Sequence, residues 1–153
     1  WAGTKTIRNL LEPPDECPRA AEERFLRTCS ASNRRALRQA IAEIETQRID
    51  RFDERVGIII DIDGSKAHWM RGRCPCITRT RGASGFYVPC RGRRLTLKER
   101  LRLQGLPTEI IKNRDGITDR QLGQMIGNAM SGNVLCALVP RVLDAAALRT
   151  RLK

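Results

Sequence analysis

The chain is poor in aromatic residues, which make up only 4% of its 153 positions. Aliphatic side chains must therefore supply most of the hydrophobic core. No apolar run approaches the roughly 18 residues of a membrane-spanning helix, and the first residues show none of the features of a targeting peptide. We therefore expect one domain, or slightly more, with an aliphatic core and with neither a membrane span nor a targeting segment.

Acidic residues are also scarce: 17 Asp and Glu face 29 Lys and Arg, which leaves a formal net charge of +12. The imbalance is strongest between Arg71 and Arg102, where ten basic residues accompany a single acid, Glu99. Such a density of positive charge repels itself unless a polyanion is bound, and nucleic acid is the leading candidate. A solvated basic surface without a dedicated partner is the alternative.

Histidine occurs once, at His68, and the six cysteines lack the paired spacing of a structural zinc site. Cys74 and Cys76 are separated by a single residue, and Cys90 stands alone. A catalytic thiol would need a general base, and none is identifiable nearby. We expect small, partly buried, reduced thiols in an intracellular protein, nuclear in a eukaryote or cytoplasmic in a bacterium.

Proline and hydrophobic periodicity predict the first elements. Three prolines indicate an irregular connection over residues 1–18. Apolar positions at three- and four-residue spacing predict a helix over residues 33–48, capped by Ser32 or Asn33. The β-branched run at 55–62 then predicts a strand.

Asp63-Gly64 predicts a hairpin that returns through residues 65–70. A further strand is expected to begin at Gly85 and to end near Pro89. The expected fold class is therefore α/β, with a mixed α+β arrangement in this piece of chain.

Two capping boxes mark later helices. Thr96 with Glu99 predicts a short helix that ends near Gly105. Thr118 with Gln121 predicts another helix in the same way.

Gly127-Asn128 interrupts this later helix, and apolar residues between 134 and 143 resume it, with Pro140 expected to kink or delay the last part. The glycine and asparagine have two interpretations. They form a simple helix break, or they let the backbone and a short amide approach a bound small molecule. Spacing alone does not decide between them.

Threonine and arginine alternate in Thr78-Arg79-Thr80-Arg81. In an extended segment this alternation would place hydroxyl and guanidinium groups on opposite sides. Hydroxyls suit phosphate oxygens, and arginine can bind guanine in the major groove. A solvated basic strand is the alternative.

Longer stretches resemble a known family. "GRRLTLKERLRLQGLP", at residues 92–107, and "QMIGNAMSGNVLCALVPRVL", at 124–143, are similar to the ninth and tenth conserved motifs of the cytosine-5 DNA methyltransferases. Residues 4–14, which contain "TIRNLLEPP", resemble the segment that leaves the catalytic domain after the eighth motif. "CPCITRTRG" and "GFYV" resemble the end of the target recognition domain.

The resemblance implies a division into three parts. Residues 1–14 would connect from a catalytic domain, 15–112 would form the target recognition domain with the ninth motif, and 113–153 would return to the catalytic domain. That domain is expected to be a Rossmann-like sheet that binds S-adenosylmethionine, with the target cytosine flipped out of double-stranded DNA and attacked by a cysteine.

The resemblance also implies site residues. Gly127, Asn128 and Ala129 would border the cofactor, and Gln124 would orient their turn. Residues expected to meet or support DNA are Thr78, Arg79, Thr80, Arg81, Arg91, Arg93 and Arg94. Met130, Ser131 and Gly132 depart from the family pattern, in which small or β-branched apolar residues and a proline are common.

Several family motifs are missing from this sequence. It contains no Phe-x-Gly-x-Gly, no Glu-Asn-Val and no Pro-Cys-Gln, since neither Pro75-Cys76 nor Pro89-Cys90 is followed by glutamine. Because the chain also begins with Trp1, we expect it to be the C-terminal half of an enzyme, inactive alone and partnered by an N-terminal catalytic half. The alternatives are a non-catalytic DNA-binding or regulatory module and part of a tRNA cytosine-5 methyltransferase.

Overall fold

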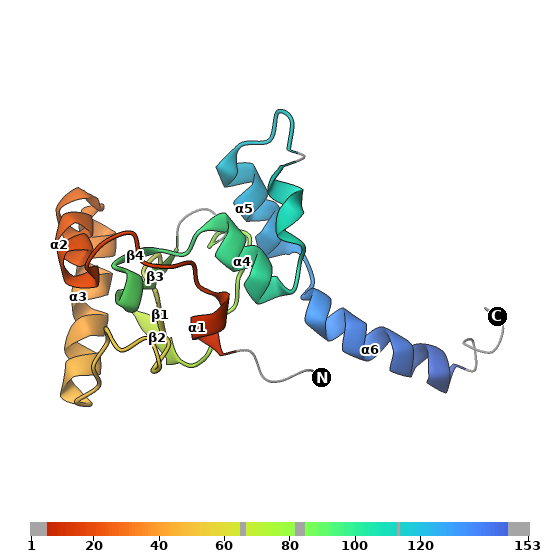
Figure 1. The fold of residues 1–153 in the computed structure, drawn as a ribbon, viewed down its shortest axis with the longest axis horizontal. Helices are drawn as coiled ribbons and strands as arrows, with labels where there is room; N and C mark the ends of the chain where they lie inside the picture. Colours follow the sequence, from red (N-terminus) through yellow and green to blue (C-terminus); the bar gives the residue numbers. More distant parts are fainter. Residues whose placement is uncertain (1–5, 65–66, 82–84, 113, 147–153) are drawn as a thin grey trace.

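The computed structural model describes residues 6–64, 67–81, 85–112 and 114–146 (Figure 1). Among these residues, three helices precede the four strands and three more helices follow them, which confirms the mixed composition expected from the sequence. The helices are α1 (Ile7–Leu10), α2 (Pro18–Thr28), α3 (Ala31–Thr46), α4 (Leu97–Gln104), α5 (Asp119–Asn128) and α6 (Gly132–Ala145). Two 3₁₀ turns, η1 (Pro89–Arg91) and η2 (Thr108–Ile111), accompany the strands β1 (Ile58–Asp61), β2 (His68–Arg71), β3 (Phe86–Val88) and β4 (Arg93–Arg94).

The four strands form one antiparallel sheet in the order β2-β1-β3-β4. β1 and β2 pair with Ile60 opposite Trp69, which confirms the pairing of the predicted hairpin. The last pair is Asp61 with His68, so the connection spans residues 62–67 and is longer than the turn expected at Asp63-Gly64; residues 65 and 66 lie outside the described part of the chain. The strand predicted over 55–62 is shorter than expected, and the strand that begins after Gly85 gives way to η1 at Pro89. Proline has no N–H to donate to a ladder, so the chain leaves the sheet there.

The run of isoleucines in β1 is explained by helices and loops on both faces of the sheet. Ile58 and Ile60 pack on one face with Tyr87 of β3, against Leu37 and Ile44 of α3. These side chains have 0–1% of their surface exposed. When both faces of a strand are covered, its sequence is continuously apolar and does not alternate.

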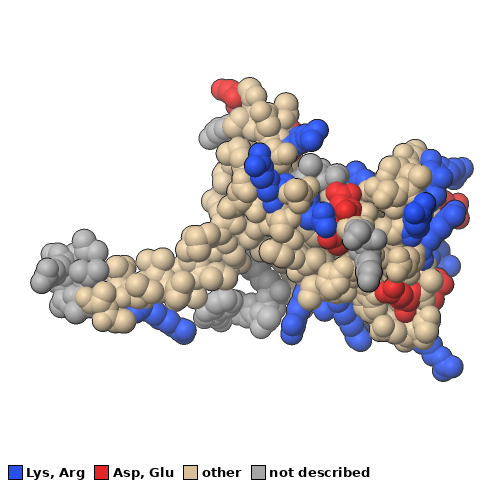
Figure 2. Space-filling model, turned by 180° about the vertical axis from the view of Figure 1, so that it is seen from behind, with Lys and Arg blue, Asp and Glu red and all other residues tan. Residues whose placement is uncertain are grey.

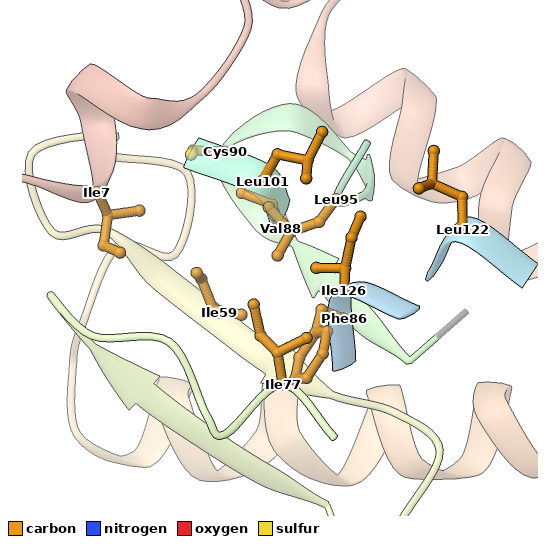
Figure 3. Close-up of a cluster of buried hydrophobic side chains, with 10 residues drawn as sticks. All are labelled: Ile7, Ile59, Ile77, Phe86, Val88, Cys90, Leu95, Leu101, Leu122 and Ile126. Carbon is orange, nitrogen blue, oxygen red and sulfur yellow. The ribbon is translucent and has the colours of Figure 1, made fainter. Parts of the chain in front are cut away.

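The opposite face of the sheet carries a second core cluster (Figure 3). Ile59, Phe86 and Val88 meet Leu101 of α4 there, together with Ile126 of α5. The close-up shows these side chains converging from the sheet and from the later helices. α4 of the predicted ninth motif and the α5 part of the predicted tenth motif are therefore packed against the same sheet.

The N-terminal region differs from the sequence expectation in three places. α1 was not predicted and forms just before the proline-containing stretch, with Ile7 buried in the core, whereas residues 11–17 are irregular as expected. α2 was not predicted, and Pro18 occupies its first turn, where a missing N–H is tolerated. α3 begins earlier than expected because Ser30, and neither Ser32 nor Asn33, caps it: the Ser30 hydroxyl accepts the N–H of Asn33.

Both predicted capping boxes are present. The N-cap side chains of Thr96 and Thr118 accept the backbone N–H groups of Glu99 and Gln121. In turn, the side chains of Glu99 and Gln121 accept the backbone N–H groups of Thr96 and Thr118. Gly105 follows α4 with φ of 67°, a left-handed conformation that glycine adopts without strain. These local signals fix the starts and ends of the two helices.

Glu99 is more than a cap residue, because its side chain is fully buried. Its carboxylate accepts two bonds from the Arg93 guanidinium, at 2.9 and 3.0 Å. It also accepts the backbone N–H of Thr96 at 2.8 Å and that of Glu12 at 2.7 Å. Burial alone would raise the pKa of Glu99, but these hydrogen bonds outweigh burial and lower it.

α6 projects away from the sheet and the other helices (Figure 1). None of its residues is buried, and Val134, Leu138 and Val142 are each about half exposed. Pro140 lies inside the helix and does not delay its start at Gly132.

The segment Asp119–Ala145 is long and apolar enough, by length and composition, to cross a membrane. It is divided, however, into α5 and α6, with Ala129, Met130 and Ser131 between them. α5 inserts Leu122 and Ile126 into the core, at 2% exposure each. The apolar length is thus shared between a core helix and a projecting helix.

Replacing Glu99 with Gln is predicted to destabilise the fold by about 3–5 kcal/mol, because it leaves the Arg93 charge without its buried partner. Urea denaturation at pH 7 measures the change. Asp53→Asn is the matched control: its carboxylate pairs with Arg55 at an exposed position and should change the unfolding free energy little.

Comparison of the wild-type chain with Glu99→Gln also gives a pH test. A lowered folded pKa means that the Glu99 contribution is present above the ordinary glutamate pKa of about 4.3 and is lost as the pH falls through the folded pKa. The wild-type chain should lose this stability in acid, whereas Glu99→Gln should show a shallower loss. Parallel curves for the two proteins would contradict the assignment.

Candidate nucleic-acid interface and the adjoining turn

The segment Thr78–Arg81 follows a residue anchored in the core. Ile77 is 8% exposed, and after it Thr78, Arg79 and Thr80 are all exposed. The hydroxyls of Thr78 and Thr80 lie 3.2 Å apart, so they share one side, as the alternation predicted. The backbone turns at residues 79–81 and is not the extended strand that was expected.

The two arginines of this segment have different surroundings. Arg81 donates from Nε to Asp61 at the end of β1, at 2.9 Å, and its side chain is 29% exposed. Arg79 is exposed and makes no ion pair with any of the residues that the structure describes. Arg81 therefore anchors the turn to the sheet, while the charge of Arg79 is available to an outside partner.

Three arginines serve the fold: Arg91 at the end of η1, and Arg93 and Arg94 in β4. Arg91 is 7% exposed, donating to the Glu12 carbonyl at 2.7 Å and to the Glu54 carboxylate at 3.1 Å. Arg93 binds Glu99, as described above. The Arg94 guanidinium lies 5.3 Å from the centre of the Phe25 ring. These groups have partners within the chain, and the DNA contact expected of them stays a prediction.

The turn at Gly127–Ala129 closes α5. The helix continues through Gly127 and ends at Asn128, so the break falls one to three residues later than predicted. The Ala129 N–H donates to the Met125 carbonyl at 3.0 Å. Asn128 is exposed, and its amide faces no described hydrogen-bond partner.

A residue that the sequence analysis missed holds this turn. Gln104, the last residue of α4, donates from its side-chain amide to the Ile126 carbonyl at 3.3 Å. Its own carbonyl accepts the Ser131 hydroxyl at 3.5 Å. The orienting role expected of Gln124 stays a prediction, while Gln104 makes the two bonds that hold the turn. No sequence pattern links Gln104 to Ile126, because the two are 22 residues apart.

The turn and the threonine-arginine segment touch each other. A Cβ placed on Gly127 would lie 2.3 Å from the Thr78 carbonyl oxygen and 2.7 Å from the Arg79 backbone nitrogen. Such distances are not found between real atoms of this kind. Gly127 therefore permits a backbone-to-backbone approach that brings residues 78–79 together with residues 127–129.

A cavity of about 400 Å³ lies elsewhere, beside the first turns of α4 and α5. It is not part of the Gly127–Ala129 turn, and its charged lining is mixed. The lining residues are Glu12, Leu95, Thr96, Leu97, Lys98, Arg100, Ile111, Arg114 and Asp119. The Arg114 and Asp119 side chains pair with each other.

Two of the cysteine thiols, those of Cys74 and Cys90, are shielded by burial. No cluster of three or more potential ligands occurs among the described residues. Burial raises the pKa of Cys74 to about 12, and the nearby Cys76 adds to the shift. Burial also raises the pKa of Cys90. Both thiols are therefore protonated at neutral pH, which is unsuited to nucleophilic attack.

Iodoacetamide labelling of the native chain at pH 8, mapped by mass spectrometry, is predicted to modify Cys76 and to spare Cys74. Cys76 is exposed, whereas Cys74 is half-buried and holds its proton. Labelling in urea is the control, since both thiols should then react alike. Faster labelling of Cys74 than of Cys76 in the native chain would contradict the structure.

Comparison with known proteins gives one match. Residues 3–143 match the family model described as C-5 cytosine-specific DNA methylase. No curated protein and no solved structure matches the chain. Because the family match covers most of the sequence and agrees with the motifs at 92–107 and 124–143, this chain belongs to the C-5 cytosine-specific DNA methylase family.

Proposed function

We propose that this chain is the C-terminal part of a DNA cytosine-5 methyltransferase and that it binds the DNA and borders the cofactor site. Membership of the family makes cytosine methylation the relevant chemistry. The observation that carries the finer proposal is the contact between Gly127 and the backbone of Thr78 and Arg79. It joins the segment suited to DNA with the turn expected to border the cofactor.

The DNA contact is assigned to the exposed part of the turn at 78–81. The Thr78 and Thr80 hydroxyls lie on one side, where they can donate to phosphate oxygens. Arg79 is exposed and makes no ion pair with the residues that the structure describes, so its charge is open to a phosphate. In this proposal Arg81 does not contact DNA directly but positions the turn, because its bond to Asp61 holds the turn on the sheet.

S-adenosylmethionine, when bound, supplies the methyl group for transfer to cytosine C5. The turn fits only one wall of such a site. The backbone of Thr78 and Arg79 fills the space where a Gly127 side chain would lie, so a cofactor cannot enter there. The side-chain amide of Asn128, in contrast, is exposed and able to hydrogen-bond. Asn128 and Ala129 are therefore the positions proposed to face the cofactor, and the other walls belong to the proposed N-terminal catalytic half.

α6 is proposed to pack against that same half. Its Val134, Leu138 and Val142 side chains are about half exposed, although residues of this kind are usually buried. Figure 2 shows basic side chains over the body of the molecule, while the projecting helix is almost free of them. An apolar helix suits a protein partner, and the basic body suits a polyanion.

The sequence supports a division of labour between the two halves. The Pro-Cys-Gln and Glu-Asn-Val motifs are missing from this chain, so the nucleophile and its supporting carboxylate would come from the N-terminal half. In the proposal, this chain positions the DNA and the cofactor and does not itself attack the base.

Arg79→Ala is predicted to weaken duplex DNA binding and to reduce the slope of log affinity against log salt by about 1, as loss of one phosphate contact does. Fluorescence anisotropy of a labelled duplex at several salt concentrations measures the slope. Arg55→Ala is the control, since Arg55 is exposed but pairs with Asp53 away from the turn.

The same assay separates the substrate classes. Unlabelled duplex DNA should displace the labelled duplex at lower concentration than tRNA does, at one fixed salt concentration. Stronger displacement by tRNA would favour the tRNA-methylating relative. An Arg79→Ala slope equal to that of the wild type would remove the proposed contact from this turn.

A further inference from the structure

The end of α5 and the exposed turn at 78–81 approach each other more closely than any side chain would permit. The position that a Cβ would take on Gly127 points toward the peptide bond that joins Thr78 and Arg79. Three backbone atoms of that peptide, the Thr78 carbon and oxygen and the Arg79 nitrogen, would lie 2.3–2.7 Å from an added Cβ. Peptide atoms cannot rotate away as a flexible side chain can, so one of the two segments would have to move.

The helix end is the more firmly held of the two. Leu122 and Ile126 of α5 are buried at 2% exposure, and the Ile126 carbonyl is bound by Gln104 of α4. Behind the turn, the Ser131 hydroxyl donates to the Gln104 carbonyl. α5 is thus fixed from the core side and from the α4 side.

The turn at 78–81 has weaker attachments. Thr78, Arg79 and Thr80 are exposed, and the segment is held by the buried Ile77 before it and by the Arg81–Asp61 bond after it. A steric conflict at Gly127 would therefore be relieved mainly by displacement of Thr78 and Arg79.

We propose that Gly127 is a positioning residue for DNA binding: the absence of its side chain sets where Thr78 and Arg79 stand relative to the Asn128–Ala129 turn. The predicted effect on DNA binding rests on the proposed function, whereas the predicted displacement of Thr78 and Arg79 does not depend on it. Under this proposal, a side chain at position 127 weakens the DNA contact although it touches neither DNA nor cofactor.

Gly132 offers a matched control. It is the first residue of α6, and a Cβ there would lie 2.7 Å from the Gly105 carbonyl oxygen. Gly132→Ala therefore introduces the same kind of clash between a helical glycine and a backbone carbonyl, but at the end of α4 and away from residues 78–79. Any general cost of a glycine-to-alanine change is common to both variants.

The test compares Gly127→Ala and Gly132→Ala in the 153-residue chain by two measurements. Backbone amide spectra should show displaced Thr78 and Arg79 signals in Gly127→Ala, whereas in Gly132→Ala the changes should centre on Gly105. Anisotropy with a labelled duplex should show several-fold weaker binding and a reduced salt slope for Gly127→Ala only. Unmoved Thr78 and Arg79 signals, or equal slopes in the two variants, would overturn the proposal.

Gln104→Ala keeps the test decisive if Gly127→Ala does not fold. This change frees the Ile126 carbonyl without adding a clash, so the signals of residues 126–128 and 78–79 should shift together. Shifts confined to 126–128 would overturn the positioning role. If the wild-type chain does not bind DNA, the proposed function fails, while the amide signals still report on Gly127.

Discussion

The buried carboxylate of Glu99 is the interaction on which the arrangement of the chain depends. It accepts hydrogen bonds from the N-terminal segment through Glu12, from β4 through Arg93 and from the start of α4 through Thr96. A fully buried charge is tolerated only when it is paired and its lone pairs are occupied, and here both conditions hold. The N-terminal segment around Glu12 and helix α4 are thereby fixed to the same sheet.

This use of acidic residues also explains where the positive charge is left over. The carboxylates of Asp61, Glu12, Glu54 and Glu99 each pair with an arginine within the fold. Arginines that have such partners stabilise the fold, although their number alone indicated a nucleic-acid partner. The net charge becomes available to a polyanion where the acids are missing, as at Arg79.

The sequence predicted those parts of the fold that local chemistry determines. The capping boxes at Thr96 and Thr118 and the strand pairing on either side of Asp63-Gly64 depend on residues a few positions apart, and each is present. α2 escaped prediction because few of its residues are buried, and one of them, Glu22, is a carboxylate that accepts the Tyr87 hydroxyl at 3.2 Å.

The candidate site was less accessible to prediction, for a physical reason. Its decisive contacts join residues far apart in the sequence: Gly127 with Thr78, Gln104 with Ile126 and Arg81 with Asp61. The motifs indicated which residues are relevant. Only the folded chain shows that Arg91 and Arg93 are committed to internal partners, and that the two predicted sites adjoin.

The central claim is that DNA meets this chain at the turn Thr78–Arg81, beside the end of α5. Backbone amide spectra recorded during titration with a short duplex test it most directly. The account predicts that the largest shifts occur at Thr78, Arg79 and Thr80, with smaller ones at Gly127 and Asn128. Shifts concentrated on α2 and α3, with residues 78–81 unaffected, would contradict it.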